Sequence, residues 1–345
     1  MNQILEKIKE FTNFKILIIS ITLTFFIAAL IVFSFYAKYS KPVGTGQNKF
    51  ELFIEEGQGS YHVSKELKNS KMIHSIRFFQ ILLKINSNTN KVKHGIYEIN
   101  DGMTANQIMD ILVSGKVKMV NFTIPEGFHN RQIAELLYIK KLIESKEKFF
   151  EIASDSALLK KYNIPANTIE GYLFPETYTI PLEYSTEKII EMMIKRFYKN
   201  LSSIEESKDL SPEELHKKVI MASIVEREAK KKEEQPLMAG VFEKRYKINM
   251  PFESCATVQY LFEKPKKRLL EKDLLIESEY NTYLHKGYPP GPISNPGLPA
   301  IKAAFSPIES DNLFFLVKPD GSHYFSKTHK EHLDAKKKYI DILYQ

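Results

Sequence analysis

The sequence predicts an α+β protein with an N-terminal transmembrane helix, a small α/β module and a larger mixed α/β domain. Residues 16–37 carry no charge, residues 50–120 mix alternating and helically spaced segments, and residues 121–345 include a helix that is apolar on every side. With 43% hydrophobic and 26% charged residues, the 345-residue chain can bury a core, which excludes wholesale disorder. We divide it into a tail (1–15), a membrane helix (16–37), a stalk (38–49) and regions 50–120 and 121–345.

The composition narrows the classes of partner. Lys and Arg number 49 and Asp and Glu 42, so the formal net charge is +7. This excess fits an anionic surface or polymer, but no arginine-rich tract indicates nucleic acid. The single cysteine, Cys255, excludes an intramolecular disulfide and a cysteine-only zinc site. The chain has no Trp, so aromatic contacts to a ligand must come from Tyr or Phe.

The uncharged segment from Ile16 to Ala37 is long enough to cross a bilayer, since about 20 apolar residues suffice. A cleavable signal peptide would have a shorter apolar stretch and a small-residue cleavage site. Ala37-Lys38-Tyr39 is a poor site of that kind, so we expect an uncleaved anchor. Lysines on both sides leave the orientation open by the positive-inside rule. No second run is long enough to span, so the rest of the chain is expected on one side.

Region 50–120 reads as a small module after a Pro- and Gly-containing stalk. Strands are predicted at 50–54 and 94–99, and helices at 60–67 and 75–85. Thr104 is expected to cap a third helix that Gly115 ends. Many small cell-surface modules would show this order of elements.

Region 121–345 has more distinctive features. A strand should end at Pro125, followed by a helix capped by Asn130. Residues 163–181 are too apolar for a solvent loop and too rich in Pro for a regular element, which favours a loop packed over a site. Ser211-Pro-Glu-Glu214 predicts the start of a buried helix. A hairpin is expected around 313–325, and a terminal helix from about residue 330.

Several kinds of enzyme are disfavoured. The chain lacks a Walker loop, a Gly-x-Gly-x-x-Gly loop, a Gly-x-Ser-x-Gly elbow and a His-Glu-x-x-His helix. We interpret His329 and His332 as surface residues and not as a pair of metal ligands. We interpret Cys255 as a structural residue and not as a nucleophile. We therefore expect no cofactor and no metal site.

The remaining chemistry is that of carboxylates, and Glu170 is the leading candidate. It lies between Ile169 and an aromatic, Pro-containing segment, so partial desolvation should raise its pKa and keep it protonated near neutrality. A general acid acting on a glycosidic oxygen needs this property. The nearby rings of Tyr172, Phe174 and Tyr178 could stack on sugars. Alternatively, Glu170 caps a helix or pairs with a Lys, and the three rings belong to the core.

Several spaced motifs together resemble the YceG-like (MltG) family of membrane-anchored endolytic peptidoglycan transglycosylases. The resemblance runs from about Phe50 to the C-terminus and keeps the order of the motifs. The motifs are Thr123-Ile-Pro-Glu-Gly127, Ile169-Glu-Gly-Tyr-Leu-Phe-Pro-Glu-Thr-Tyr178, Ala222-Ser-Ile-Val-Glu-Arg-Glu228, Tyr280-Asn-Thr-Tyr283, Pro289-Pro-Gly-Pro-Ile-Ser-Asn-Pro-Gly297, Gly321-Ser-His-Tyr-Phe325 and Glu331-His332. One departure is Cys255-Ala256, where many members have Asp-Pro, so no acidic role is expected there.

The resemblance implies a fold, a location and a reaction. Region 50–120 would be a LysM-like module and region 121–345 the catalytic domain, and both would lie outside the cytoplasmic membrane. The chain would cross that membrane once and would have a cytoplasmic tail. Glu170 would be the catalytic residue that cleaves the MurNAc–GlcNAc bond of nascent peptidoglycan without hydrolysis. The resulting 1,6-anhydro-MurNAc ends would terminate strand elongation, with peptidoglycan synthases as partners. Further candidates for the substrate cleft are Glu226, Glu228, Asn281, Tyr283, His323 and, with less support, Arg245.

Two other classes of function stay open on the sequence. One is a non-catalytic wall-binding scaffold that recruits synthesis proteins, and the other is a retaining or inverting hydrolase. A hydrolase usually needs a second carboxylate, whereas attack by a hydroxyl of the same sugar does not. Glu226 lies on the helix face that also carries Leu215 and Val219, so it is the carboxylate that could assist Glu170.

Overall fold

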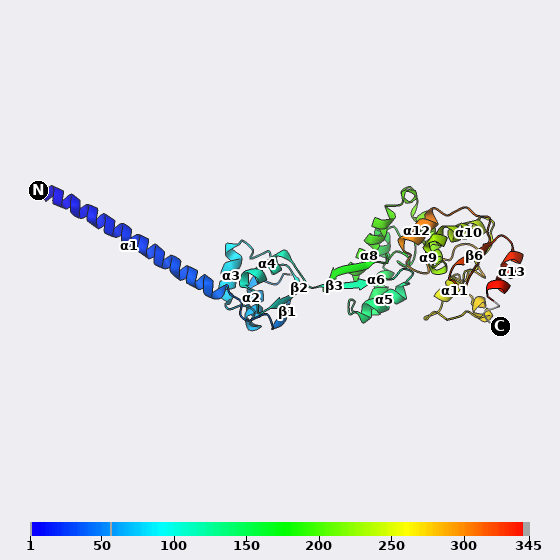
Figure 1. Ribbon diagram of the computed structural model, residues 1–345, viewed down its shortest axis with the longest axis horizontal. Coiled ribbons are helices and arrows are strands. Elements are labelled where there is room, and N and C mark those ends of the chain that lie inside the picture. Colours follow the sequence, from blue (N-terminus) through cyan, green and yellow to red (C-terminus); the bar gives the residue numbers. More distant parts are fainter. Residues whose placement is uncertain (1, 56, 341–345) are drawn as a thin grey trace. The chain divides into compact units, whose positions relative to one another are not determined.

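The structure is a computed structural model that describes residues 2–55 and 57–340 (Figure 1). Contacts divide the chain into two compact units. The first holds the chain up to Val120 together with Ile180–Glu183, and the second holds Asn121–Thr179 and the chain from Tyr184 on. The fold is mixed α/β, as predicted, with an apolar helix at the N-terminus.

The first element, α1 (Asn2–Tyr39), is a single helix that includes residues 2–15 of the predicted tail as well as the predicted membrane segment. The segment from Phe14 to Tyr39 has a mean hydropathy of 2.9. No residue in its most apolar 18-residue stretch is buried. By length and composition this helix can cross a bilayer. A helix of this hydropathy in water would expose a continuous apolar surface, so the expectation of a membrane span is retained.

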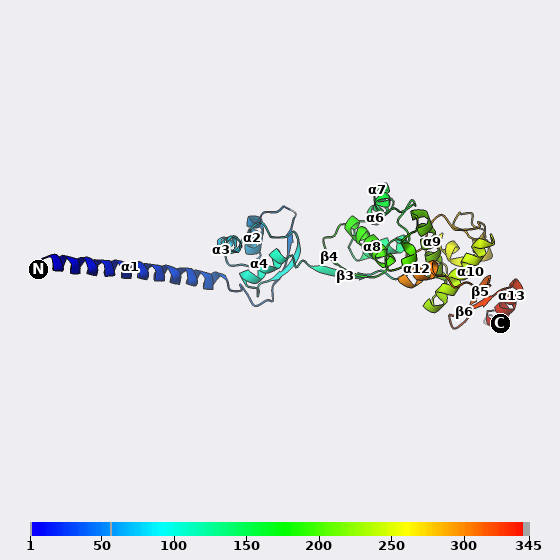
Figure 2. The ribbon, with the colours of Figure 1, turned by 90° about the horizontal axis from the view of Figure 1, so that it is seen from above.

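The rest of the first unit contains the elements that the sequence predicts for a small module. These are β1 (Lys49–Ile54), α2 (Ser60–Asn69), α3 (Ile76–Ile85), β2 (Gly95–Asn100) and α4 (Ala105–Ser114). The two strands pair antiparallel, with Phe50 opposite Ile99. Figure 2 shows the helices α2, α3 and α4 of this unit grouped together. Alternate strand residues such as Leu52 and Tyr97 are buried with the apolar faces of the three helices. Gly115 ends α4 in the left-handed conformation, at φ 73°.

A second two-stranded sheet joins β3 (Met119–Thr123) and β4 (Thr177–Pro181). The long segment between them contains three helices of the second unit and the loop that carries Glu170. Just beyond β3, the N–H of Ile124 donates to the carbonyl of Glu176 at 2.9 Å. This pairing brings the start and the end of that segment together.

The second unit is mainly helical and is built around α9 (Pro212–Glu228). Its other helices are α5 (Asn130–Ile139), α6 (Lys146–Ala153), α7 (Ser156–Lys161), α8 (Thr186–Leu201), α10 (Gln235–Lys247), α11 (Cys255–Tyr260), α12 (Leu298–Phe305) and α13 (His329–Tyr339). Three short 3-10 turns lie at Glu205–Ser207, Lys232–Glu234 and Glu271–Leu275. The predicted hairpin is present as β5 (Phe314–Val317) and β6 (His323–Ser326).

Helix α9 is buried as the sequence predicts. The Ser211 hydroxyl accepts the N–H of Glu214, and the Glu214 carboxylate accepts the N–H of Ser211, which makes the expected capping box. All residues from Val219 to Val225 are buried, because α10, α11 and α12 pack around this helix. The result is a rigid scaffold for the loops that follow its C-terminal end.

One predicted cap is wrong. Asn130 was expected to cap α5, but the N-cap is His129, whose backbone is extended and whose Nδ1 accepts the N–H of Gln132. Asn130 is the first residue of the helix and is buried. Its N–H is therefore one of the unpaired donors of the first turn and is free to bind a group outside the helix.

Candidate functional site

Glu170 lies in the loop between α7 and β4, and its side chain is 6% exposed. Its N–H donates to the hydroxyl of Thr168 at 2.9 Å. The next residue, Gly171, has φ of 91°, and a Cβ there would lie 2.5 Å from Pro292 and 2.8 Å from Val219. Only glycine fits this turn, so the packing of α9 and the Pro292 loop fixes the direction in which Glu170 points.

Three groups hold the carboxylate of Glu170 from different parts of the chain. The backbone N–H of Asn130 lies 3.0 Å from both Oε1 and Oε2. The side-chain amide of Asn295 donates to Oε1 at 3.0 Å. The hydroxyl of Tyr260, the last residue of α11, lies 3.2 Å from Oε2. The carboxyl is thus buried, but each oxygen has two polar partners.

The orientation of Asn295 follows from its other contacts. Its Oδ1 accepts the N–H groups of Gly171 at 3.0 Å and Leu173 at 2.8 Å. Since an amide oxygen has only acceptor lone pairs to offer, the Nδ2 group must face the other way. There it donates to Glu170 and to the carbonyl of Phe128 at 3.0 Å. Asn295 therefore ties the turn after Glu170 to its carboxyl group.

Burial is the largest influence on the acidity of Glu170, and it raises the pKa to about 7 from an ordinary value of 4.5. The hydrogen bonds from Asn130, Tyr260 and Asn295 act in the opposite direction, as does the nearby charge of Arg131. These donors stabilise the ionised form enough to keep the pKa near neutrality. Such a group can both give and take a proton at neutral pH.

The N-terminus of α5 contributes its dipole as well as the Asn130 N–H. Its cap, His129, is buried next to Arg131 and Arg227, and burial together with these cations lowers its pKa to about 4. His129 is thus neutral at neutral pH. Arg131 is the cation of this site, because its side chain acts on Glu170 and lies over the ring of Tyr260 at 4.8 Å.

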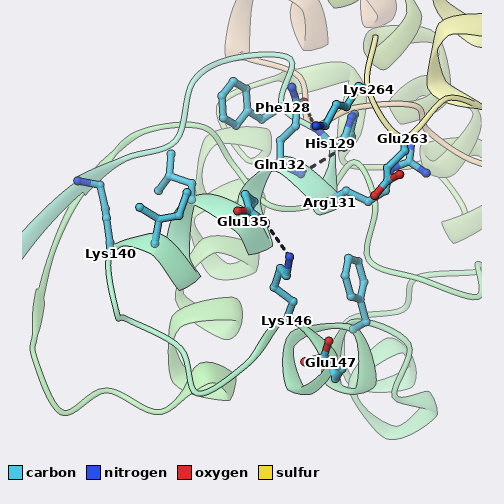
Figure 3. A pocket seen from close by; sticks show the side chains of 13 residues that line it. Phe128, His129, Arg131, Gln132, Glu135, Lys140, Lys146, Glu147, Glu263 and Lys264 are labelled. Carbon is cyan, nitrogen blue, oxygen red and sulfur yellow. Dashed lines mark hydrogen bonds and ion pairs between the residues drawn. The ribbon is translucent and has the colours of Figure 1, made fainter.

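A cavity of about 930 Å³ adjoins this part of the fold (Figure 3). His129 and Arg131, the neighbours of Asn130, lie on its wall together with other residues of α5. The wall also includes Phe128 and Lys140 on either side of α5, Lys146, Glu147 and Phe150 of α6, and Glu263 and Lys264 beyond α11. Lys146 bonds to Glu135 across it at 2.9 Å. The volume and the mixture of apolar, acidic and basic side chains are suited to an extended, polar ligand.

The three aromatic residues near Glu170 lie in the core. Tyr172 has no exposed surface, and its hydroxyl is bonded to Nδ1 of His216 at 2.9 Å. Phe174 and Tyr178 are also buried, and the Tyr178 hydroxyl donates to the carbonyl of Phe174. The three residues are between 0% and 8% exposed, which leaves no ring face free to stack on a sugar, so the expected sugar-stacking role is not retained for them. The alternative interpretation, that they are core, fits their burial.

Glu226 lies next to the Glu170 site but does not hydrogen bond with Glu170. Its Oε2 accepts the N–H of Gly297 at 3.0 Å, two residues beyond Asn295. Burial, and to a smaller extent the neighbouring Glu126, raises the pKa of Glu226. Its observed contact is with the loop that carries Asn295.

The other cleft candidates lie away from the Glu170 carboxyl. Glu228, Tyr283 and His323 line a second cavity of about 580 Å³, together with Cys255, Arg245 and the pair His329 and His332. Glu228 accepts the N–H of Ala256, and His323 is bonded to Glu234 at 2.7 Å. Within residues 2–55 and 57–340, no cluster of three or more His, Cys, Asp or Glu side chains could hold a metal ion.

Asn281 and Arg245 have structural contacts. Asn281 has no exposed surface, and its amide donates to the carbonyls of Leu274 and Ile276. The buried Arg245 donates to the carbonyls of Leu313 and Phe252. Both side chains therefore fasten loops of the second unit.

The residues that contact Glu170 were not among the sequence candidates. Asn295 lies in the Pro- and Gly-rich loop quoted above, but nothing in its local sequence marks it out from its neighbours. Tyr260 and Arg131 lie in unremarkable helical segments, 90 and 39 residues from Glu170. Only the three-dimensional fold brings these positions together.

The sequence of this chain is similar to those of known proteins. The YceG-like family model matches residues 52–338. An endolytic murein transglycosylase of Bacillus subtilis is 35% identical over 305 residues, covering 83% of this chain and 84% of that protein. One of Streptococcus pneumoniae is 28% identical over 326 residues, covering 84% of this chain and 58% of that protein.

A solved structure is also similar. The crystal structure of a YceG-like protein from Listeria monocytogenes has 33% sequence identity and a TM-score of 0.57. The match covers 84% of this chain and 99% of that one. The family model spans most of the sequence, and the motifs around Glu170 fall within it; the chain belongs to the YceG-like family.

Proposed function

We propose that this protein is an endolytic murein transglycosylase and that Glu170 is its catalytic residue. The observation that carries the proposal is a buried carboxyl whose pKa is raised to about 7 by desolvation and which three donors hold in place. The relatives from Bacillus subtilis and Streptococcus pneumoniae bear the name of this activity. The hydrogen bonds of the Asn295 side chain to Glu170, Gly171, Leu173 and Phe128 form what we call the Asn295 clamp. This clamp gives the carboxyl the fixed geometry that proton transfer requires.

In the first step, protonated Glu170 gives its proton to the oxygen that links N-acetylmuramic acid to N-acetylglucosamine. The bond between C1 and this oxygen breaks, and positive charge develops at C1. The ionised carboxylate that remains is stabilised by the Asn130 N–H, the Asn295 amide and the charge of Arg131.

In the second step, the C6 hydroxyl of the same muramic acid attacks C1, and Glu170 takes up the hydroxyl proton. The product is a 1,6-anhydro end, and no water is consumed. The nucleophile is already held beside C1, so no second carboxylate is needed. The groups that act most strongly on Glu170 are Asn130, Tyr260, Arg131 and Asn295, none of which is a carboxylate. This favours a lyase over a hydrolase, which uses a carboxyl pair.

We further propose that α1 anchors the chain in the cytoplasmic membrane, with both units on the outer side. The module of the first unit would be LysM-like and bind glycan. Its strand–helix–helix–strand order supports this, as does a cavity of about 830 Å³ between the segment before α2 and the segment before β2. Cleavage within nascent strands, next to peptidoglycan synthases, would terminate their elongation. Membrane anchoring would keep the enzyme where new strands emerge.

Digestion of purified peptidoglycan tests this function. Mass spectrometry of the products should find 1,6-anhydro-muramic ends. Reducing ends in their place would indicate a hydrolase, and undigested glycan would indicate a wall-binding scaffold; either result would refute the proposal.

The pH profile should follow the ionisation of Glu170. Because the free enzyme must hold the proton before the first step, kcat/KM should be level below a pH of about 7 and fall roughly tenfold per pH unit above it. Initial rates on soluble glycan strands between pH 5 and pH 9 measure this limb. A limb near pH 4.5 would mean that burial does not set the acidity of the catalytic group.

A further inference from the structure

We propose that Glu170 gives and takes its proton at Oε2, and that Tyr260 is the positioning residue that lets this oxygen change its protonation state. This inference deepens the proposed function and rests on it for its meaning in the reaction.

Oxygen Oε1 is surrounded by groups that donate to it. The side-chain amide of Asn130 is one of them, because in the orientation in which its oxygen accepts the N–H of Glu170 at 3.2 Å, its nitrogen donates to Oε1 at 3.2 Å. The Asn130 N–H and the Asn295 Nδ2 group both lie 3.0 Å from it. The Asn295 amide cannot turn over to offer its oxygen, because Oδ1 is occupied by the N–H groups of Gly171 and Leu173. A proton on Oε1 would point at donor groups and find no acceptor among them. Oε1 therefore acts as the carbonyl oxygen of the protonated acid.

Oxygen Oε2 has a partner of another kind. The Tyr260 hydroxyl lies 3.2 Å away and can donate to an ionised oxygen or accept from a protonated one. Rotation about the C–O bond of tyrosine switches between the two roles without movement of the ring. Oε2 is thus the carboxyl oxygen at which both protonation states are satisfied.

The ring of Tyr260 is held firmly enough for this role. Arg131 lies over one part of it at 4.8 Å and also donates from Nη2 to the Tyr260 carbonyl. Tyr280 and His129 pack against it with ring centroids at 5.2 and 5.9 Å. Arg131, Tyr260 and Tyr280 are the charged or titratable groups near Glu170, and His129 faces it through the Tyr260 ring.

During the reaction the proton leaves Oε2 for the glycosidic oxygen, and the Tyr260 hydroxyl then donates to the Oε2 that is left ionised. When the C6 hydroxyl attacks, its proton returns to Oε2, and Tyr260 turns back to accept. No net proton is gained or lost over the cycle. Removal of the hydroxyl should therefore disfavour the ionised form of Glu170.

Tyr260→Phe tests this assignment, with Tyr280→Phe as the matched control. The control removes the hydroxyl of Tyr280, which belongs to the neighbouring ring and does not hydrogen bond to Glu170. In protein labelled with 13C at the Glu carboxyl carbons, NMR titration should show the pKa of Glu170 higher by about one unit in Tyr260→Phe. The signal is identified by its loss in Glu170→Gln. Tyr280→Phe should titrate like the wild type, and the alkaline limb of kcat/KM should move with the pKa.

Infrared difference spectra identify the protonated oxygen. The C=O stretch of protonated Glu170 should have the same frequency in Tyr260→Phe as in the wild type, because the carbonyl oxygen Oε1 keeps both N–H donors. A higher frequency in the variant would place the carbonyl at Oε2 and overturn the assignment. An unchanged titration in Tyr260→Phe, or an equal shift in Tyr280→Phe, would also overturn it. These titrations need no substrate, so they separate this inference from a failure of the proposed activity, which only product analysis reports.

Discussion

Glu170→Gln is expected to fold, to bind glycan and to produce no anhydro ends. Glutamine has the size of glutamate and can still accept from Asn130 and Asn295 at Oε1, but it cannot give up a proton. Loss of a general acid that also serves as base should lower kcat by at least about a thousandfold. The rate of anhydro-end formation measures this effect, with glycan co-sedimentation as the control for binding.

The same substitution should change stability in a pH-dependent way. The pKa of Glu170 is about 7 in the folded protein and about 4.5 when unfolded, so between these values the folded state binds more protons. The stability of the wild type should therefore decline as the pH rises through this window, by on the order of 3 kcal/mol. Glutamine does not titrate, so the stability of Glu170→Gln should not show this decline. Urea unfolding should show the variant gaining on the wild type from pH 5 to pH 8, and a constant difference would argue against a buried acid.

Asn295→Asp is the second substitution with a large expected effect. Asp can still accept from Gly171 and Leu173, but its other oxygen would face Oε1 of Glu170 and the Phe128 carbonyl, where Nδ2 now donates. This places one buried acceptor oxygen next to two others, which should lower the free energy of unfolding by about 3 kcal/mol. The pKa of Glu170 should rise further because like charges would adjoin.

Asn281→Asp is the matched control for Asn295→Asp. Asn281 is also fully buried and also donates to two acceptors, the carbonyls of Leu274 and Ile276, but it has no contact with Glu170. Both variants should lose stability in urea unfolding, whereas only Asn295→Asp should move the alkaline limb of kcat/KM upward. An equal displacement of the limb in both variants would mean that the effect is general loosening rather than loss of the Asn295 clamp.

Local sequence patterns were sufficient for most of the elements. The uncharged run predicted an apolar helix, Ser211 and Glu214 predicted the start of α9, and Thr104 with Gly115 predicted both ends of α4. These signals depend on residues close in sequence, so one chain is enough to read them. Glu170 could be proposed for a related reason, since an acid inside an apolar segment is already suggestive.

The partners of Glu170 could not be predicted because they come from distant positions and act partly through the backbone. The Asn130 contact is made by an N–H group, which every residue except Pro possesses. Asn295 contacts the carboxyl only because its loop packs against Gly171. The role of Tyr172, Phe174 and Tyr178 could not be predicted because aromatic rings occur both on sugar-binding surfaces and in cores. Only their burial in the structure distinguishes the two.

In the proposed reaction the nucleophile comes from the sugar and not from water. Digestion of peptidoglycan in water enriched in 18O tests it directly, with mass spectrometry of the newly formed muramic ends. The expected ends are lighter than reducing ends by one water and carry no 18O. Reducing ends labelled with 18O at C1, absent in Glu170→Gln, would show that Glu170 activates water and would contradict the proposed reaction.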